Sequence, residues 1–361
     1  MTRLGLVGLG GAGRNHAGNL VDLDCDLVAG ADVVPEVRSS FAADYDVDTY
    51  ESHEAMYEDA DLDGVVVTTP NAYHEPPVTA ALERDIHTLC EKPLSNTLEG
   101  AESIVDAAHA SNAFCMVGFH NRFSTAAEIL TEHRENGRLG DIIHIEADYV
   151  RRRGIPGIGS WFTNRDLSGG GALIDLGIHL IDFALYLADF PEVVEVSGAT
   201  RSEFGTREDY VDPDDFGGNW EDSSGTFDVD DSASAFVRCA DGTTISLEVA
   251  WACNRDFSKE VVVRGTDAGA RCSLGGDSVE LLETSAEGTH HFVDSDLSGS
   301  LDPSGHAAED ARFIDAIEAD EAPSINTVEE GLAVQRVVDA IYRSSETGGA
   351  VSVADSTASA D

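Results

Sequence analysis

Asp175 and His179 could carry out acid–base chemistry, because an apolar stretch with helical periodicity places them four residues apart. Residues at this spacing share one face of a helix, and burying such polar groups without partners is costly. One interpretation is a structural carboxylate–imidazole hydrogen bond. The other is an oriented general base, in which Asp175 positions an imidazole whose pKa lies near the working pH. A zinc pair is a third interpretation, but no further ligand cluster supports it.

Lys92 is a second candidate, because lysine is almost absent from this chain. Of the 22 basic residues only Lys92 and Lys259 are lysines. Lys92 follows a predicted strand that ends at Cys90, where ligands bind in an open α/β sheet, and Pro93 imposes a turn there. Its ammonium could stabilise developing alkoxide character, a contact worth about 3–4 kcal/mol. The alternative is an exposed loop lysine.

A glycine-rich turn near the N-terminus has the spacing that binds a dinucleotide. Gly8, Gly10 and Gly13 follow a predicted strand and open a predicted helix. The first glycine permits the tight turn, the second lets the backbone approach a pyrophosphate, and the third lets helix and strand pack closely. Gly11 and Ala12 are expected at the helix N-terminus, where backbone amides favour phosphate. The alternative is an ordinary glycine-rich turn of an α/β protein.

Asp32 indicates which dinucleotide would bind. It ends the second predicted strand, at the point where a carboxylate hydrogen-bonds the adenosine ribose and repels a 2′-phosphate. NAD is therefore favoured over NADP, unless Asp32 is only a turn residue. With this cofactor, His179 could take the proton of a hydroxyl whose carbon gives up hydride, and Lys92 could bond the same oxygen. The sequence thus predicts a dehydrogenase.

The elements that must position these groups change character along the chain. In the first third, short apolar runs alternate with helical patterns, which predicts a parallel sheet of the Rossmann type. The predicted strands there are Leu4–Gly8, Asp26–Ala31, Gly64–Thr68, Ile86–Cys90 and Ala113–Val117. The first predicted helix follows the glycine turn and ends at Leu20, and two more are predicted over Pro76–Glu83 and Thr97–Ala110.

The remainder predicts an α+β domain with a large open, mostly antiparallel sheet. Its predicted strands are Asp141–Val150, Val193–Thr200, Ser232–Cys239, Thr244–Cys253 and Glu260–Val263, and its helices are Ala172–Leu187, Ala307–Ala319 and Thr327–Ser345. We place the domain boundary between residues 121 and 122, with the option that the last helices pack back on the Rossmann domain. Glu203–Asp231 is predicted to be an exposed acidic loop, and the tail from Gly348 is predicted to fray.

Composition excludes several classes of protein. The net charge of −46, from 68 acidic and 22 basic residues, excludes a nucleic-acid binder and disfavours an acidic membrane. The acid is spread along the whole chain, as on surfaces that work at high salt. Six scattered cysteines show no metal-binding spacing and predict free thiols in a reducing cytoplasm. We expect no signal peptide and no membrane span, because no run of 18 apolar residues occurs.

The order of these motifs resembles the glucose–fructose oxidoreductase / inositol dehydrogenase / MocA family nearly from end to end. The resemblance rests on Gly8–Gly13, Thr69-Pro70-Asn71-Ala72-Tyr73-His74, Glu91-Lys92-Pro93, Gly118-Phe119-His120-Asn121-Arg122-Phe123, Gly169-Gly170-Gly171 with Asp175 and His179, Glu248-Val249-Ala250-Trp251 and Phe313-Ile314-Asp315-Ala316-Ile317. The resemblance implies Lys92, Asp175 and His179 as the catalytic set. It implies that Asn71 and His74, in the segment with Thr69 and Pro70, lie near the ribose and nicotinamide, and that Glu91 and Pro93 help hold the cofactor. Sugar or cyclitol substrates and a homodimer or homotetramer formed through the sheet are also implied.

Five further side chains are predicted to face the substrate: Arg122, Arg151, Arg153, Trp161 and Asn164. For the arginines, salt bridging on an acidic protein is an equal alternative. Three other functions stay open beside a dehydrogenase. They are an NAD-dependent glycoside hydrolase with transient oxidation, an oxidoreductase that recycles a tightly bound cofactor, and a non-catalytic NAD-binding regulator.

Overall fold

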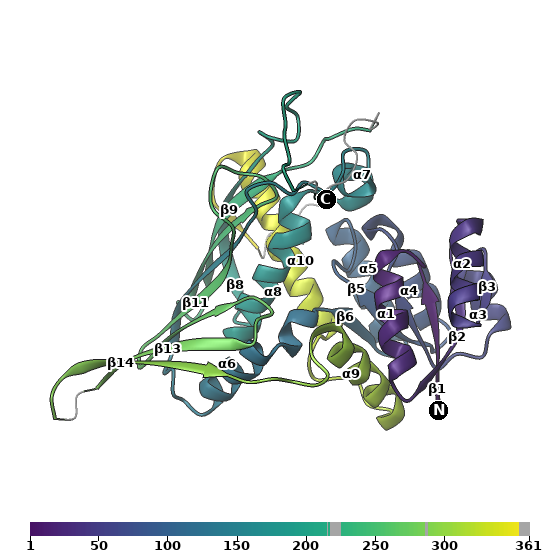
Figure 1. The fold of residues 1–361 in the computed structure, drawn as a ribbon, viewed down its shortest axis with the longest axis horizontal. Coiled ribbons are helices and arrows are strands. Elements are labelled where there is room, and N and C mark those ends of the chain that lie inside the picture. Colours follow the sequence, from purple (N-terminus) through teal and green to yellow (C-terminus); the bar gives the residue numbers. More distant parts are fainter. Residues whose placement is uncertain (215, 217–224, 286–287, 354–361) are drawn as a thin grey trace. The chain divides into compact units, whose positions relative to one another are not determined.

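The computed structural model describes residues 1–214, 216, 225–285 and 288–353, and it divides into two compact units (Figure 1). The first unit is Met1–His120 with Pro303–Ala333, and the second is Asn121–Asp302 with Val334–Asp361. Residues 303–333 thus return to the first unit, whereas the boundary drawn from the sequence assigned them to the second domain. The physical reason is that helix α9 (Gly305–Ala319) packs against α1 (Gly11–Asp22).

The first unit is built on a six-stranded sheet of order β3-β2-β1-β4-β5-β6, in which every neighbouring pair is parallel. This confirms the predicted Rossmann sheet. The central strand β4 is fully buried and consists of one glycine and three valines. The six strands are β1 (Thr2–Val7), β2 (Cys25–Ala31), β3 (Asp48–Tyr50), β4 (Gly64–Val67), β5 (His87–Glu91) and β6 (Cys115–Gly118).

The helices of the first unit follow the strands along the chain. Beside α1 and α9 they are α2 (Pro35–Tyr45), α3 (His53–Asp59), α4 (Glu75–Leu82) and α5 (Leu98–Ala110), with the 3-10 turn η1 (Asn71–Tyr73). A second 3-10 turn, η2 (His120–Phe123), begins at the last residue of this part of the unit. The sequence analysis missed α2, β3 and α3. Phe41 is the one buried residue of α2, so its pattern carries almost no amphipathic signal.

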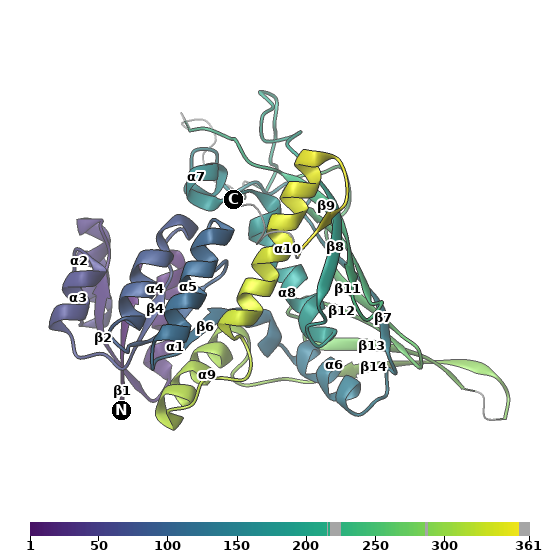
Figure 2. The ribbon, with the colours of Figure 1, turned by 180° about the vertical axis from the view of Figure 1, so that it is seen from behind.

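The second unit is built on a nine-stranded sheet of order β14-β13-β12-β11-β7-β10-β9-β8-β15 (Figure 2). Its pairs are antiparallel except β7 with β10, which confirms the mostly antiparallel sheet. The strands are β7 (Ile142–Val150), β8 (Val193–Arg201), β9 (Ser232–Cys239), β10 (Thr244–Ala250), β11 (Ser258–Gly265), β12 (Gly269–Ser273), β13 (Ser278–Ser285), β14 (His291–Ser298) and β15 (Val351–Ser352). Helices α6 (Thr125–Glu135) and α8 (Ile178–Leu187) contact this sheet, and α10 (Val328–Thr347) contributes residues to both units.

The predicted helix Ala172–Leu187 is not one regular α-helix. A π-helical turn, η4 (Leu173–Gly177), precedes α8, and the short helix α7 (Arg165–Ser168) lies before it. In the described residues, the stretch Arg165–Leu187 is long and apolar enough to cross a membrane, with a mean hydropathy of 1.5. Because 89% of that window is buried inside the protein, the stretch has the character of a core helix.

Two loop predictions are wrong where the structure describes them. The tail does not fray directly after Gly348, because Val351 and Ser352 pair with β8. Within the predicted exposed loop 203–231, Asp230 and Asp231 are buried. Both carboxylates accept backbone N–H groups, which compensates their burial. Residues 215, 217–224 and 354–361 of these segments lie outside the described residues.

Candidate active site

The turn between β1 and α1 has the geometry of a dinucleotide cradle. Gly8 has a φ of +91°, which favours glycine, and a Cβ on Gly13 would clash with the Gly8 carbonyl oxygen. At Gly10 and Gly11 a Cβ would meet open space, so a ligand can approach the backbone there. No side chain caps the N-terminus of α1, which the structure describes in full. These residues therefore fit a bound pyrophosphate.

Asp32 bonds the same turn. Its Oδ2 accepts the Leu9 N–H at 2.9 Å and its Oδ1 accepts the Val34 N–H at 2.9 Å. Asp32 is thus a turn residue that also fixes the glycine-rich segment. Each carboxylate oxygen has a second lone pair, so these bonds leave Asp32 able to accept a ribose hydroxyl.

His74 connects two of the segments predicted to hold the cofactor. Its Nδ1 lies 2.8 Å from the Pro93 carbonyl oxygen and its Nε2 lies 2.7 Å from that of Thr69. The imidazole is 1% exposed, and burial lowers its pKa, while the contacts with the two carbonyl oxygens act against that shift. Pro70 precedes η1, whose first residue, Asn71, is buried. His74 is therefore placed to hold the Thr69 and Pro93 turns together.

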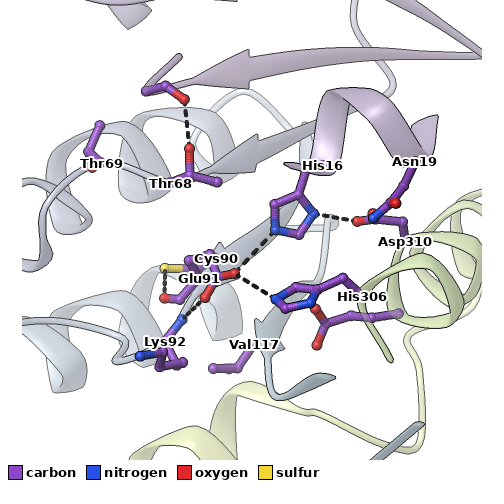
Figure 3. Close-up of polar contacts among 12 residues, drawn as sticks. His16, Asn19, Thr68, Thr69, Cys90, Glu91, Lys92, Val117, His306 and Asp310 are labelled. Atoms are coloured by element: carbon purple, nitrogen blue, oxygen red, sulfur yellow. Dashed lines mark hydrogen bonds and ion pairs between the residues drawn. The ribbon is translucent and has the colours of Figure 1, made fainter. Parts of the chain in front are cut away.

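Glu91 is the centre of a buried charged network that the sequence analysis missed (Figure 3). Its Oε1 lies 3.2 Å from His16 Nε2 and 3.7 Å from His306 Nε2, while its Oε2 accepts the Lys92 N–H at 3.0 Å. On the far side of the ring, His16 Nδ1 lies 2.6 Å from Asp310 Oδ1. Helices α1 and α9 thus both reach the turn that carries Lys92.

The charges of this buried network are stabilised by neighbouring side chains rather than by water. Burial alone lowers the pKa of His16, but the bonds to Asp310 and Glu91 raise it well above 6.5. Burial alone raises the pKa of Glu91, but the bond to His16 and its charge hold it well below 4.5. Burial lowers the pKa of His306. A buried imidazolium between two carboxylates follows.

One sequence signal could have identified part of this network. His16 lies three residues after Gly13 on a helix whose other buried residues are small or apolar, and a buried histidine needs partners. Asp310, some three hundred residues later, carries no such signal. Its pairing with His16 becomes visible only in the folded chain.

In the second unit, the imidazole of His179 has a partner to which the sequence analysis gave no role. Asn121 Nδ2 lies 3.1 Å from His179 Nδ1, and His179 is 8% exposed. Asp175 Oδ2 accepts the Trp251 indole N–H at 3.0 Å. Asp175 lies on the π-helical turn and His179 on α8, so the two are not related by a regular α-helical spacing.

The amide of Asn121 can bond Nδ1 of His179 in either tautomer of the ring. With Nδ2 toward Nδ1, as in this structure, Nδ1 accepts and the ring hydrogen lies on Nε2. For Nε2 to accept a proton, Nδ1 must carry the ring hydrogen and donate it to the amide oxygen, an orientation that a rotation of the amide reaches. Asn121 therefore orients the ring in both tautomers.

Asp230 holds the start of the segment that bears Asp175. It accepts the N–H groups of Gly171 and Leu173 at 2.8 and 2.9 Å, and the Tyr342 hydroxyl at 2.8 Å. A Cβ on Gly171 would clash with the backbone of Asp230, which explains a glycine there. Burial raises the pKa of Asp230 despite these bonds.

Arg122 is a buried anchor in this structure rather than a group open to a substrate. It is 2% exposed, its Nη2 lies 2.6 Å from Asp182 Oδ1, and its guanidinium lies over the rings of Tyr186 and Phe190. Paired and desolvated in this way, Arg122 has no role in the substrate proposal below.

The other predicted substrate residues lie in or near one loop region. Residues 151–153 follow the end of β7 and are not a strand, so strand alternation does not place Arg151 and Arg153 on one face. Arg153 bonds the carbonyl oxygen of Cys253 and the side chain of Asn254. Trp161 stacks on Phe162, and Asn164 caps α7. Within the described residues, no cluster of three or more His, Cys, Asp and Glu is arranged to hold a metal ion.

Comparison with known proteins matches both parts of the chain to family models. One, described as "Oxidoreductase family, NAD-binding Rossmann fold", matches residues 2–119, and another, described as "GFO/IDH/MocA C-terminal domain", matches residues 128–271. The D-glucoside 3-dehydrogenase of Escherichia coli (strain K12) is 31% identical over 90% of this chain and 89% of its own length.

Two further similarities are to a second named dehydrogenase and to a solved structure. The D-xylose 1-dehydrogenase (NADP(+)) 2 of Haloferax volcanii is 29% identical over 88% of this chain and 89% of its own length. The solved structure of a levoglucosan dehydrogenase in complex with NADH and levoglucosan superimposes with a TM-score of 0.84. It covers 98% of this chain and 99% of that chain at 23% identity. At that identity the likeness shows the fold.

Proposed function

The chain belongs to the GFO/IDH/MocA family and is an NAD-binding oxidoreductase acting on CH–OH groups, and from this premise we propose that it oxidises a ring hydroxyl of a sugar, sugar derivative or cyclitol. The observation that carries the proposal is the His179 imidazole, bonded by Asn121 at its Nδ1. An imidazole held at one nitrogen is an oriented acid–base group.

Each half of the proposed chemistry is prepared within its own unit. NAD, held by the glycine turn, supplies the hydride acceptor when bound. His179 takes the hydroxyl proton, and Lys92 donates a hydrogen bond to the same oxygen. The buried Glu91 carboxylate fixes the backbone at Lys92, and Asp175, held by Trp251, assists from the second unit.

NAD rather than NADP is the proposed cofactor. Asp32 places a carboxylate next to Leu9 and Val34, where a 2′-phosphate would be repelled. The relative from Haloferax volcanii is named for NADP(+), so this preference needs its own test. Replacing Asp32 by alanine should lower kcat/KM with NAD. The ratio of kcat/KM with NADP to kcat/KM with NAD should therefore rise. An unchanged ratio would show that Asp32 only fixes the turn.

The function is tested with purified full-length protein, NAD and a panel of aldoses, sugar acids, inositols and glycosides in molar salt, followed at 340 nm. We expect NADH to accumulate with at least one sugar or cyclitol. His179→Ala and Lys92→Ala should each lose most turnover, while NAD binding, measured by calorimetry, persists. Near-normal turnover in either variant would remove that residue from the proposed mechanism.

The alternatives give different products. A hydrolase would release an aglycone without net NADH, and an enzyme that recycles a tightly held cofactor would show absorbance at 340 nm before any substrate is added. A binding protein would show neither. In the His179→Ala and Lys92→Ala variants, loss of either activity with NAD still bound would identify these residues as reacting groups.

We also propose a working environment and an assembly. The net charge of −46 and the relative from Haloferax volcanii support a cytoplasmic enzyme that works at high salt. The large sheet of the second unit supports a homodimer or homotetramer. Light scattering after gel filtration in molar KCl tests the assembly, and a monomer there would contradict it.

A further inference from the structure

Cations on the outer face of the nine-stranded sheet have carboxylate partners. Arg264 on β11 is paired with Glu146 on β7, and Arg271 on β12 lies 3.5 Å from Glu260 and 3.4 Å from Glu280. Such pairs are what a chain with 68 acidic and 22 basic residues should form. These paired cations contrast with two cations elsewhere on the same sheet, which have no carboxylate partner among the described residues.

Lys259, the second of the two lysines, lies on the opposite face of β11. It shares that face with the buried Val261 and Val263, and in the ladder it is opposite Tyr149 of β7. Its Nζ lies 5.3 Å from the centroid of the Tyr149 ring. Over the described residues, the Lys259 ammonium has no carboxylate within 4.0 Å and makes no side-chain hydrogen bond.

Arg151 contacts the same ring. Its guanidinium carbon lies 5.4 Å from the Tyr149 centroid, and its N–H groups reach the Gly154 carbonyl oxygen and the Tyr149 hydroxyl. Within the part of the chain that the structure describes, Arg151 also lacks a carboxylate partner. Two cations therefore share one half-buried tyrosine, and neither charge is neutralised by a neighbouring side chain there.

Lys259 and Tyr149 lie near the side chains that hold the proposed acid–base groups. Lys259 Nζ lies 3.7 Å from the point where a Cβ of Gly275 would sit, and Asn121 Oδ1 lies 2.6 Å from that same point. Asn121 is the partner of His179. Tyr149 packs on the apolar cluster that contains Trp251, whose indole holds Asp175.

We propose that Lys259 and Arg151 bind an anionic group on the substrate, a carboxylate or a phosphate. The inference rests on the proposed sugar dehydrogenase function and narrows its substrate to a sugar acid or a sugar phosphate. Two like charges in a half-buried position repel one another, and an anion relieves that repulsion while accepting charge-assisted hydrogen bonds. Lysine provides three donors, and Arg151 has donors beyond the two that bond Gly154 and Tyr149.

The test compares matched probes with the full-length enzyme and NAD: D-glucose, D-glucuronate and D-glucose 6-phosphate, and the same three forms of galactose. We expect kcat/KM for one anionic form to exceed that of the neutral sugar by about tenfold or more, the value of one charge-assisted bond. The preferred form distinguishes a carboxylate from a phosphate. Raising KCl from about 1 M to about 3 M should reduce this ratio, because salt screens the attraction.

Variants test whether the preference for an anionic sugar comes from the face of the sheet that bears Lys259. Lys259→Met should lower the anionic-to-neutral ratio about tenfold, Lys259→Arg should restore it, and Arg151→Gln should lower it independently. Arg264→Met on the outer face is the matched control and should leave the ratio unchanged. Equal losses with neutral and anionic sugars in both Lys259→Met and Arg151→Gln would show a structural cation–π role and overturn the proposal.

The remaining outcomes separate the two proposals. Oxidation of neutral sugars without any gain from the anionic forms leaves the dehydrogenase function standing and overturns the anionic substrate. If neither these probes nor the wider sugar and cyclitol panel is oxidised, the dehydrogenase function fails, and the anionic substrate fails with it.

Discussion

His16 Nδ1 lies 2.6 Å from Asp310 Oδ1, and both side chains are fully buried. This contact joins α1, the helix that follows the glycine turn, to α9, which belongs to the first unit although residues 121–302 of the second unit separate it from β6. Glu91 contacts the other ring nitrogen, so a buried imidazolium lies next to the residue that precedes Lys92 (Figure 3). The charge of the network therefore makes the stability of this unit depend on pH.

The first prediction concerns that dependence. The raised pKa of His16 contributes stability that is complete below its ordinary value of 6.5 and is lost as pH rises through the folded-state pKa. The depressed pKa of Glu91 contributes stability above its ordinary value of 4.5 that is lost as pH falls. The network should therefore stabilise the protein most between these limits, near pH 5 to 6.5.

His16→Gln tests this window. Breaking a buried pair costs about 3–5 kcal/mol, so the free energy of unfolding should fall by that order near pH 6 and by less at higher pH. The measurement is denaturant unfolding at several pH values in fixed molar salt. His109→Gln, which removes an exposed pair with Glu329, is the control and should cost little. A difference that does not vary with pH would contradict a charged His16.

A second prediction concerns the glycine turn. Gly13→Ala places a Cβ against the Gly8 carbonyl oxygen, so NAD binding should be lost. Gly18→Ala in the same helix meets nothing within 4 Å and should bind NAD normally, with stability raised by up to about 1 kcal/mol. Calorimetric titration with NAD, together with circular dichroism, separates the two. Normal NAD affinity in Gly13→Ala would show that the cofactor does not use this turn.

Arg122 and Asp182 provide a third prediction, because their ion pair is buried on both sides. Arg122→Met should cost about 3–5 kcal/mol of unfolding free energy, because Asp182 remains as an uncompensated buried charge. Arg122→Met combined with Asp182→Leu should cost less than Arg122→Met alone. Denaturant unfolding of the three proteins measures this. If the Arg122→Met enzyme were instead stable but had a raised KM for the sugar, Arg122 would be a substrate contact, as the sequence predicted.

The sequence predicted elements with strong periodicity and missed relationships that depend on distant contacts. Strand β4 was predictable because a buried parallel strand is an unbroken apolar run, and Gly8 to Gly13 was predictable because glycine spacing reflects backbone geometry. The i, i+4 relationship of Asp175 and His179 assumed a regular α-helix, and the π-helical turn changed it.

The missed site residues share one physical reason. Asn121 and Asp230 lie far from their partners along the chain, and nothing in their local sequence distinguishes them from a loop amide and an acidic loop residue. Arg122 was assigned to substrate because an arginine after a strand of the sheet faces a ligand as often as a carboxylate. Its buried partner Asp182 lies on α8, and only the packing of α8 reveals the pair.

The last prediction concerns Asn121, whose amide bonds Nδ1 of His179. Asn121→Asp places a carboxylate on Nδ1, and an opposite charge at this distance raises the pKa of an imidazole by about 1–3 units. Because a base must be neutral to accept a proton, the acidic limb of the kcat profile should move to higher pH by that amount. Asn121→Leu removes the partner of Nδ1, so kcat should fall about tenfold or more without a comparable change in KM for NAD. Rate profiles between about pH 5 and pH 10 with saturating sugar measure both effects. If Asn121→Asp left the acidic limb in place, the titrating base would be a group other than His179.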